Sequence, residues 1–247
     1  DGLDTRLMDI YGVSNNVAKP GVRLFEAWYE QPIGPFSIHA GLIAADQEFV
    51  LAEHSTVLLD ATFGIVAMLS YNIGNPVYPV AAPGASLHYD SELVKLRAAF
   101  YANQVESHGI PQDVGGDGLF INEVEFLDMF KLGFWHHTTL GDGYYAIADK
   151  QLERYIGTFA RVSYAPDSPL SVYADTGIRI GPGPLRKRDF ASIGLAFART
   201  EIGAQTIVEA TYQYLVKGWL TMQPDAQLLL TRTGTAGVFA LRAVVAL

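Results

Sequence analysis

Two carboxylates and an indole occupy alternate positions of one short segment, as Glu26, Trp28 and Glu30. A pair of carboxylates can hydrolyse a glycosidic bond when the two groups lie roughly 5 to 10 Å apart. Apolar and polar residues alternate around this segment, which predicts a β-strand. Residues four positions apart on a strand are separated by about 13 Å, so Glu26 and Glu30 are too distant for that chemistry.

Other residues that could do chemistry lack the necessary spacing. The sequence contains no nucleophile elbow, phosphate-binding loop or metal-ligand motif. His136 and His137 are adjacent, so on a strand they point to opposite faces and do not form one metal site. We therefore expect no enzyme activity, no metal and no other cofactor. The basic run Arg186–Arg188 is expected to be a solvated turn.

The composition is apolar and poor in charge. Hydrophobic residues make up 49% of the 247 residues and charged residues 17%, compared with about 25% charged in average soluble domains. The longest apolar stretch, from Thr56 to Ile73, contains polar residues and does not resemble a membrane-spanning helix. The net charge of −9 argues against nucleic acid as a partner. There is no cysteine, so the chain forms no disulfide.

Alternation with a period of two runs through most of the second half of the chain. From Leu170 to Ile180, one set of alternate residues is apolar and the other contains Tyr173, Asp175 and Arg179. This pattern predicts an antiparallel meander of strands joined by short turns. We expect about eleven strands, or twelve, near Leu3–Tyr11, Val22–Glu30, Phe36–Leu42, Val94–Asn103, Glu123–His136, Tyr155–Tyr164, Leu170–Ile180, Phe190–Arg199, Gln205–Val216, Trp219–Leu230 and Val238–Leu247.

The apolar faces of these strands must be buried either in a protein core or in lipid. A soluble all-β sandwich would turn the charged face outward, and the alternation alone permits that arrangement. Many residues of the apolar faces are small, such as Ala27, Ala98 and Ala174, and fill a thick core poorly. Aromatic residues lie near strand ends, as in the interfacial girdles of membrane barrels. These two details favour a transmembrane antiparallel up-and-down β-barrel with a polar lumen.

Three segments interrupt the meander: Ala44–Ser91, Gln104–Asn122 and Gly141–Arg154. The first is too long for a turn, contains a stretch that could be helical (Thr56–Tyr71) and ends in a run rich in proline and glycine. Long loops in compact domains usually carry function. We expect Ala44–Ser91 to fold into the lumen and form a constriction, with Glu53, His54 and Asp60 as its polar groups. An external cap is the alternative.

Several segments, in order, resemble the carbohydrate-selective porins of bacterial outer membranes, the OprB family. They are Gly12–Asn16, Arg23–Gln31, Pro76–Pro79 with Gly84, Tyr145–Gln151, Phe159–Arg161, Tyr173–Gly177, and Gln223–Gln227 with Leu241 and Arg242. Each segment is short, and the specificity of the resemblance comes from their shared order over most of the chain.

The resemblance implies a 16-stranded barrel that passes mono- and small oligosaccharides by diffusion into the periplasm. It implies one porin domain over residues 1–247, contact with outer-membrane lipid and lipopolysaccharide, and a monomer or homotrimer. The chain departs from the family in strand number: the strands that precede Gly12–Asn16 in the family have no counterpart. Either those strands are missing from this sequence, or the barrel closes with a smaller diameter. The family often has arginine at the position of His39.

A sugar offers hydroxyl groups and apolar ring faces, so a selective pore needs planar side chains together with fixed donors and acceptors. Trp28 between two glutamates, opposite Lys95 and Arg97, would supply these groups. The same charges could instead form a salt-bridge network that only holds strand register. A general small-solute porin, or a soluble carbohydrate-binding or hydrolytic domain, is the alternative function. The candidate pore-lining residues are Glu26, Trp28, Glu30, His39, Glu53, Asp60, Lys95, Arg97, Arg161, Tyr173, Asp175, Arg179 and Arg242.

Overall fold

The computed structural model describes residues 12, 14, 24–64, 67–74, 76–78, 80–102, 117–183, 186 and 188–246. Within these residues, one antiparallel sheet of 13 strands runs in sequence order from β1 to β13. The strands are β1 (Ala27–Ile33), β2 (Phe36–Ile43), β3 (Ala82–Asp90), β4 (Val94–Ala102), β5 (Gly118–Phe126), β6 (Phe130–His137), β7 (Gly141–Glu153), β8 (Ile156–Tyr164), β9 (Leu170–Ile180), β10 (Phe190–Thr200), β11 (Gly203–Lys217), β12 (Leu220–Thr231) and β13 (Gly234–Val245).

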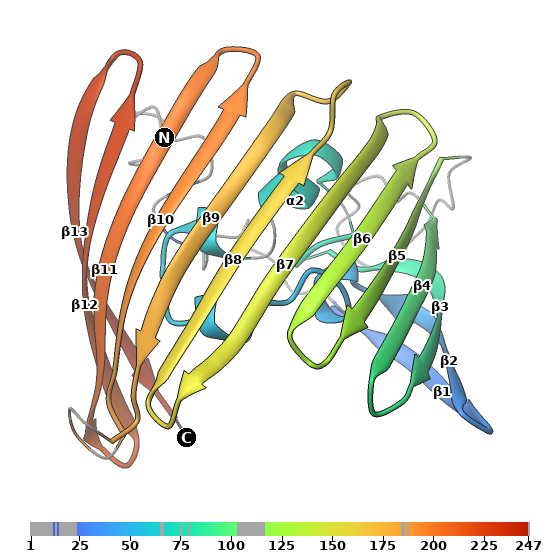
Figure 1. The fold of residues 1–247 in the computed structure, drawn as a ribbon, viewed down its shortest axis with the longest axis horizontal. Helices are drawn as coiled ribbons and strands as arrows, with labels where there is room; N and C mark the ends of the chain where they lie inside the picture. The colour runs from blue at the N-terminus through green and yellow to red at the C-terminus, as the bar shows by residue number, and fades with distance from the viewer. Residues whose placement is uncertain are drawn as a thin grey trace.

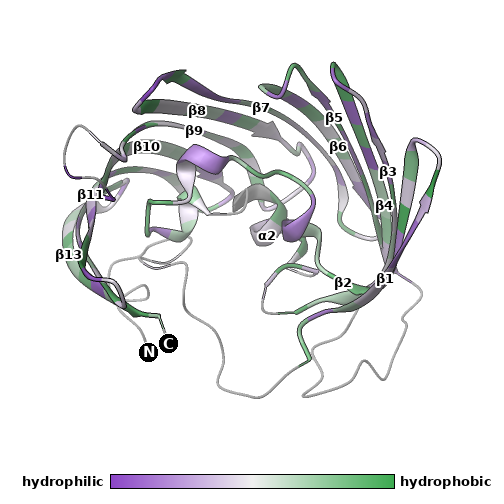
Figure 2. Ribbon diagram, turned by 90° about the horizontal axis from the view of Figure 1, so that it is seen from below, coloured by the Kyte–Doolittle hydropathy of each residue, from purple (hydrophilic) through white to green (hydrophobic). Residues whose placement is uncertain are grey.

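Every strand pairs with its neighbours in the sequence, so the topology is up-and-down throughout (Figure 1). The sheet curves strongly, and the chain between β2 and β3 lies within the curve (Figure 2). The described part of that chain contains three short 3₁₀ turns and one helix: η1 (Ala45–Gln47), η2 (Glu53–Ser55), η3 (Ala61–Phe63) and α2 (Ala67–Ile73). No helix among the described residues is long and apolar enough to cross a membrane.

The outer face of the sheet is apolar and exposed, whereas the polar side chains of the strands are concentrated on the inner face, where many are buried. In β10 the two sets of residues alternate along the strand: Ile193 is 63% exposed and Leu195 is also exposed, while Ser192 is buried. In β8, Val162 is exposed and Arg161 is buried. This distribution is the reverse of that in a soluble sandwich, and it is the distribution that a sheet with lipid outside and a polar lumen requires.

The structure corrects the expected strand near Glu123–His136, which is two strands. The chain turns at residues 127–129, where Leu127 and Asp128 adopt positive φ angles of 56° and 49°. Phe126 pairs with Phe130 across this three-residue turn. Because the turn contains an odd number of residues, odd-numbered positions face inward on both strands, and the sequence alternation continues through the turn without a break.

The other two corrections concern expected loops. Gly141–Arg154 is almost entirely strand β7, and the end of Ala44–Ser91 is strand β3. In β7 the inward positions carry the apolar side chains of Tyr145 and Ile147, both buried, so the alternation is obscured. The described residues therefore hold 13 strands rather than eleven or twelve. The expected strand Leu3–Tyr11 and most of the expected connection Gln104–Asn122 lie outside the described residues, and the last five residues of that connection belong to β5.

An arginine on the outer face should impair assembly. We expect Ile193→Arg to lower the stability of the membrane-inserted protein by about 2–4 kcal/mol, because the charge would lie in hydrocarbon. Urea unfolding in lipid vesicles, followed by tryptophan fluorescence, measures this loss. The control is Glu201→Arg in the exposed turn between β10 and β11, which should unfold like the unaltered protein. Equal stability of the two variants would contradict the assignment of the outer face.

Candidate functional site

The chain from residue 44 to residue 81, here called the inner segment, packs against the concave face of the sheet. The strands of the sheet are here called the wall. The apolar side chains Phe49, Leu58 and Phe63 of the inner segment are buried in one cluster with wall residues that include Trp135 and Phe159. Burying one such side chain contributes about 1.5–3 kcal/mol. This cluster is the main apolar core, and it lies between the inner segment and the wall rather than between two sheets.

Two inward-facing glycines allow this close approach. A Cβ atom on Gly157 of β8 would lie 1.7 Å from Cδ2 of His54, and one on Gly194 of β10 would lie 2.6 Å from Cδ1 of Leu58. Real Cβ contacts are never so short. A larger residue at either position would displace the side chain of His54 or Leu58, so glycine lets these side chains lie directly on the backbone of the wall.

Carboxylates of the wall accept hydrogen bonds from the backbone of the inner segment. Glu123 of β5 accepts one from the amide of Val50 at 2.9 Å, and also accepts the hydroxyl of Tyr145 at 3.0 Å. Lys131 of β6 donates to the carbonyl of Leu51 at 3.0 Å. These bonds satisfy backbone groups that have no strand partner, which a buried loop must do to avoid a large desolvation cost.

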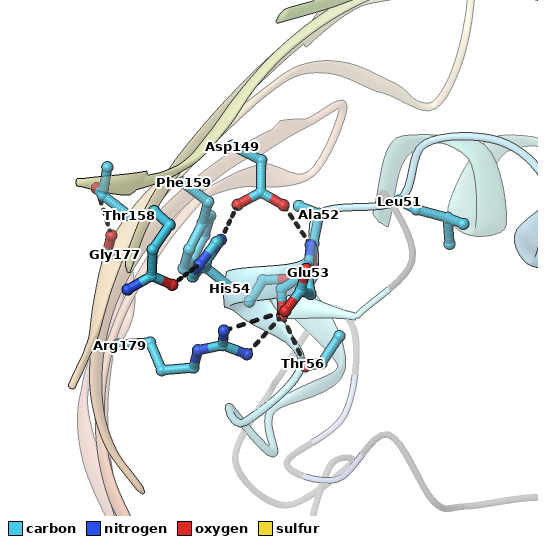
Figure 3. Close-up of polar contacts among 12 residues, drawn as sticks. Leu51, Ala52, Glu53, His54, Thr56, Asp149, Thr158, Phe159, Gly177 and Arg179 are labelled. Atoms are coloured by element: carbon cyan, nitrogen blue, oxygen red, sulfur yellow. Dashed lines mark hydrogen bonds and ion pairs between the residues drawn. The ribbon is translucent and has the colours of Figure 1, made fainter. Parts of the chain in front are cut away.

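The same arrangement continues at η2 (Figure 3). Asp149 of β7 accepts from the amide of Glu53 with one oxygen and pairs with Nδ1 of His54 through the other. Nε2 of His54 contacts Oε1 of Gln151 at 3.0 Å. Arg179 of β9 binds the carboxylate of Glu53 at 3.1 Å. One turn of the inner segment is thus held by charged or amide side chains from β7 and β9.

A buried arginine holds the next turn, η3. The guanidinium of Arg161 is 2% exposed, pairs with the carboxylate of Asp175, and donates to the carbonyls of Gly64 at 2.6 Å and Phe63 at 2.9 Å. The hydroxyl of Tyr173 lies 2.6 Å from the carbonyl of Thr62. Because the arginine is paired and hydrogen-bonded, its charge is tolerated away from water.

Further anchors come from the strands near the end of the chain and from β9. Glu209 of β11 accepts from the amides of Leu59 and Asp60. Gln223 of β12 donates to the carbonyl of Val57 at 2.6 Å. The side chain of Asn72 in α2 exchanges two hydrogen bonds with the backbone of Leu170, at 2.9 and 2.8 Å, as a neighbouring strand would. Side chains from β5 to β12 therefore hold the inner segment along its length.

Three of the expected pore-lining residues, Trp28, Glu30 and His39 of the first two strands, form a connected group. Glu30 lies 3.3 Å from Nε2 of His39. The ring of Trp28, which is half exposed, stacks on His39 with centroids 5.0 Å apart. Glu26 accepts a hydrogen bond from the amide of Ala44, the first residue of the inner segment. These four residues face the same side of the sheet as the inner segment.

The remaining expected residues divide into two sets. Lys95 and Arg97 of β4 face the lumen and pair with Asp128 at 2.6 Å and Asp90 at 2.7 Å. Arg242 of β13 donates to Gln223. The other set, Asp60, Arg161, Tyr173 and Asp175, is buried between the wall and the inner segment. One carboxylate oxygen of Asp60 accepts a hydrogen bond from the amide of Thr62, so Asp60 caps the start of the turn η3.

Several anchoring residues did not emerge as candidates from the sequence. They are Glu123, Lys131, Asp149, Glu209 and Gln223, together with Glu48 of the inner segment and His88 of β3, which lie 3.4 Å apart. Those that belong to the wall occupy the alternate strand positions whose side chains face inward, and this is the one sequence signal that could have identified them. Their importance depends on where the inner segment lies, which strand alternation does not reveal.

The described inner segment leaves polar cavities beside it. One, of about 710 Å³, is lined by residues from η2 and from β4 to β7, with charges of both signs: Lys95, Lys131 and Lys150 together with Glu53, Glu125, Asp128 and Asp149. Another, of about 690 Å³, lies on another side of the segment and reaches Arg161 and Arg242. The described residues therefore narrow the lumen without filling it.

Two carboxylates of the inner segment have shifted pKa values. Burial raises the pKa of Asp46 above its ordinary value, although the carboxylate accepts from the amide of Tyr78 at 3.1 Å. Burial also acts to raise the pKa of Glu48, but contacts with His88, Ser86 and His39 outweigh this effect and lower the pKa. Glu48 is therefore ionised at neutral pH.

Removing the buried arginine should release the turn that it holds. We expect Arg161→Met to lower the free energy of unfolding by about 3–5 kcal/mol, because Asp175 would be left buried without its partner. The double variant Arg161→Met/Asp175→Leu should lose less, since no unpaired charge remains. Denaturant unfolding of the detergent-purified protein measures both values. The matched control is Arg199→Met at an exposed position of β10, and a double variant less stable than the single one would contradict this account.

Comparison with known proteins places this arrangement in a family. The low-pH structure of OprB from Pseudomonas putida superimposes with a TM-score of 0.61 at 15% identity, covering 90% of this chain and 67% of that one. A mutant of the Rhodopseudomonas blastica porin gives a TM-score of 0.53 at 10% identity, covering 87% and 76%. At these identities the likeness shows the fold. No curated protein matches the sequence.

The family described as carbohydrate-selective porin, OprB family, matches residues 5–129, just over half of the 247 residues. This span begins before β1, includes the whole inner segment and ends at the turn before β6. Together, the strand topology, the apolar outer face and the family match indicate a channel rather than an enzyme. The chain belongs to the OprB family of carbohydrate-selective porins and is an outer-membrane β-barrel porin.

Proposed function

We propose that this porin passes small uncharged carbohydrates in preference to ions of similar size. The observation that carries the proposal is the balance of charge around the narrowed lumen. Pores selective for ions place rings of one sign of charge along the path. Here the cavity beside η2 contains lysines and carboxylates in similar number, which favours neutral solutes that both donate and accept hydrogen bonds.

The pairing of these charges supports the proposal. Lys95 lies 2.6 Å from Asp128 and 3.5 Å from Glu125, and Lys131 lies 3.7 Å from Glu125. Lys95 and Lys131 are thus neutralised by neighbouring carboxylates, which reduces the field that an ion would experience. The paired groups still offer donors and acceptors to hydroxyl groups that pass between the inner segment and the wall.

We assign two roles to the residues singled out in the sequence. Residues open to the lumen would contact the passing solute: Trp28, Glu30, His39, Glu53, Lys95, Arg97, Arg179 and Arg242. Residues at or behind the inner segment would hold it in place: Glu26, Asp60, Arg161, Tyr173 and Asp175. His39 stacks on one face of the Trp28 ring and so fixes its orientation. The opposite face of the ring would contact the apolar face of a sugar. We propose that the whole chain forms one porin domain.

Liposome swelling with solutes of equal size and different charge tests the selectivity. The set is glucose, gluconate and glucosamine, each added as an isotonic solution to vesicles that contain the purified protein. We expect glucose to enter several-fold faster than either charged analogue. Rates that depend only on solute size would instead support a general small-solute porin.

Trp28 provides a second, local test. We expect Trp28→Ala to reduce the block of ion current by added sugar, because a stacking surface in the lumen is removed. Planar-bilayer recordings in increasing glucose measure the block. Trp219→Ala is the matched control, since Trp219 is equally exposed but follows β11 at a turn, where Lys217 lies over its ring. An unchanged block in Trp28→Ala counts against a role for Trp28 in sugar passage.

A further inference from the structure

We propose that His39, Glu48 and His88 form a binding site for a divalent transition metal ion, with Zn²⁺ as the best-suited ion. The three residues come from β2, the inner segment and β3. One potential ligand atom from each lies within 4.8 Å of the others. Two histidines and one carboxylate form a common ligand set of zinc sites that keep an open position.

The distances fit this role. Nδ1 of His39 lies 2.9 Å from Oε1 of Glu48, and Nε2 of His88 lies 3.4 Å from Oε2. The two imidazole rings have centroids 4.3 Å apart and are tilted by 59°, so they are not stacked face to face. Ligand atoms around tetrahedral zinc are about 3.4 Å apart. The side chains therefore need to move by no more than roughly 1.4 Å to enclose an ion.

Neighbouring residues orient the ligands as they do in known metal sites. Glu30 lies 3.3 Å from Nε2 of His39, the ring nitrogen opposite the proposed ligand atom. A carboxylate in this position fixes the tautomer and makes the metal-bound nitrogen more basic. Ser86 donates its hydroxyl proton to Oε1 of Glu48 at 3.0 Å. Nε2 of His88 lies 3.1 Å from the same hydroxyl oxygen. In the tautomer with the proton on Nδ1, His88 would offer its Nε2 lone pair to the metal ion.

The charge near the site suits a dication. Glu30 and Glu48 together contribute two negative charges. Lys95, Arg97 and Lys131 line the same cavity, of about 310 Å³. Each of these cations has an acidic partner, Lys95 and Arg97 at 2.6 and 2.7 Å and Lys131 at 3.7 Å. The cavity has room for a water molecule as a fourth ligand. An ion bound here would tie the inner segment to β2 and β3.

Metal titration of the detergent-purified protein, first treated with EDTA, tests the site. We expect one Zn²⁺ per chain by calorimetry and by emission spectroscopy after gel filtration, and a visible absorption band of tetrahedral Co²⁺. His39→Gln and His88→Gln should each lose the Zn²⁺ uptake and the Co²⁺ band. Glu30→Gln should weaken Zn²⁺ binding about tenfold, because it orients a ligand without binding the metal.

His136→Gln is the control, because His136 is exposed and pairs with Asp142 away from the site. It should bind Zn²⁺ like the unaltered protein. Histidine modification by diethylpyrocarbonate, mapped by mass spectrometry, tests the site without any substitution. Zn²⁺ should protect His39 but not His136. No saturable Zn²⁺ uptake by the unaltered protein, full uptake by both ligand variants, or no selective protection would overturn the proposal.

Discussion

The backbone polar groups of the inner segment need hydrogen-bond partners, and the wall of the sheet provides them. The backbone of a loop inside a curved sheet does not pair with the backbone of a neighbouring strand. Each of its buried polar groups that is left without a hydrogen bond costs about 1–3 kcal/mol. Glu123, Asp149, Arg161, Glu209 and Gln223 each bind a backbone amide or carbonyl of this segment. The charged inner face of the sheet is thus the means by which the constriction is held.

This constraint explains the composition of both faces of the sheet. Lipid requires apolar side chains outside, while the inner segment requires charges, amides and glycines inside. Gly157 and Gly194 are examples of the second requirement, because each allows a residue of the inner segment to contact the wall backbone. Where apolar residues of the segment meet the wall, the inward positions are apolar as well, as at Trp135 and Tyr145. The inner face is therefore polar in some places and apolar in others.

The sequence predicted the architecture well where one face of each strand meets lipid and the other meets polar groups. The expected strand Leu170–Ile180 has the bounds of β9, and the alternation marked Tyr173, Asp175 and Arg179 as one face. The sequence failed where this contrast is lost. β7 was missed because Tyr145 and Ile147 pack inward, and the turn at Leu127 was missed because it preserves the alternation.

The partners of the anchoring residues could not be predicted from strand patterns. Arg161 and Asp175 are opposite one another in neighbouring strands, so their pairing follows from the register. The contacts of Arg161 with Phe63 and Gly64 depend on the path of a segment about 98 residues away in the sequence. The cluster of His39, Glu48 and His88 also arises from two strands and a loop. Such sites depend on tertiary structure and cannot be predicted from a local sequence motif.

Amide hydrogen exchange of the inner segment tests the central claim most directly. In the protein held in detergent micelles, the amides of Val50, Glu53, Leu59 and Asp60 should exchange far more slowly than those of the exposed turns, because each donates to a wall carboxylate. Glu209→Gln should speed the exchange of Leu59 and Asp60 and leave Val50 unchanged. Exchange of all four amides at the rate of the exposed turns would show that the segment does not lie bound inside the sheet.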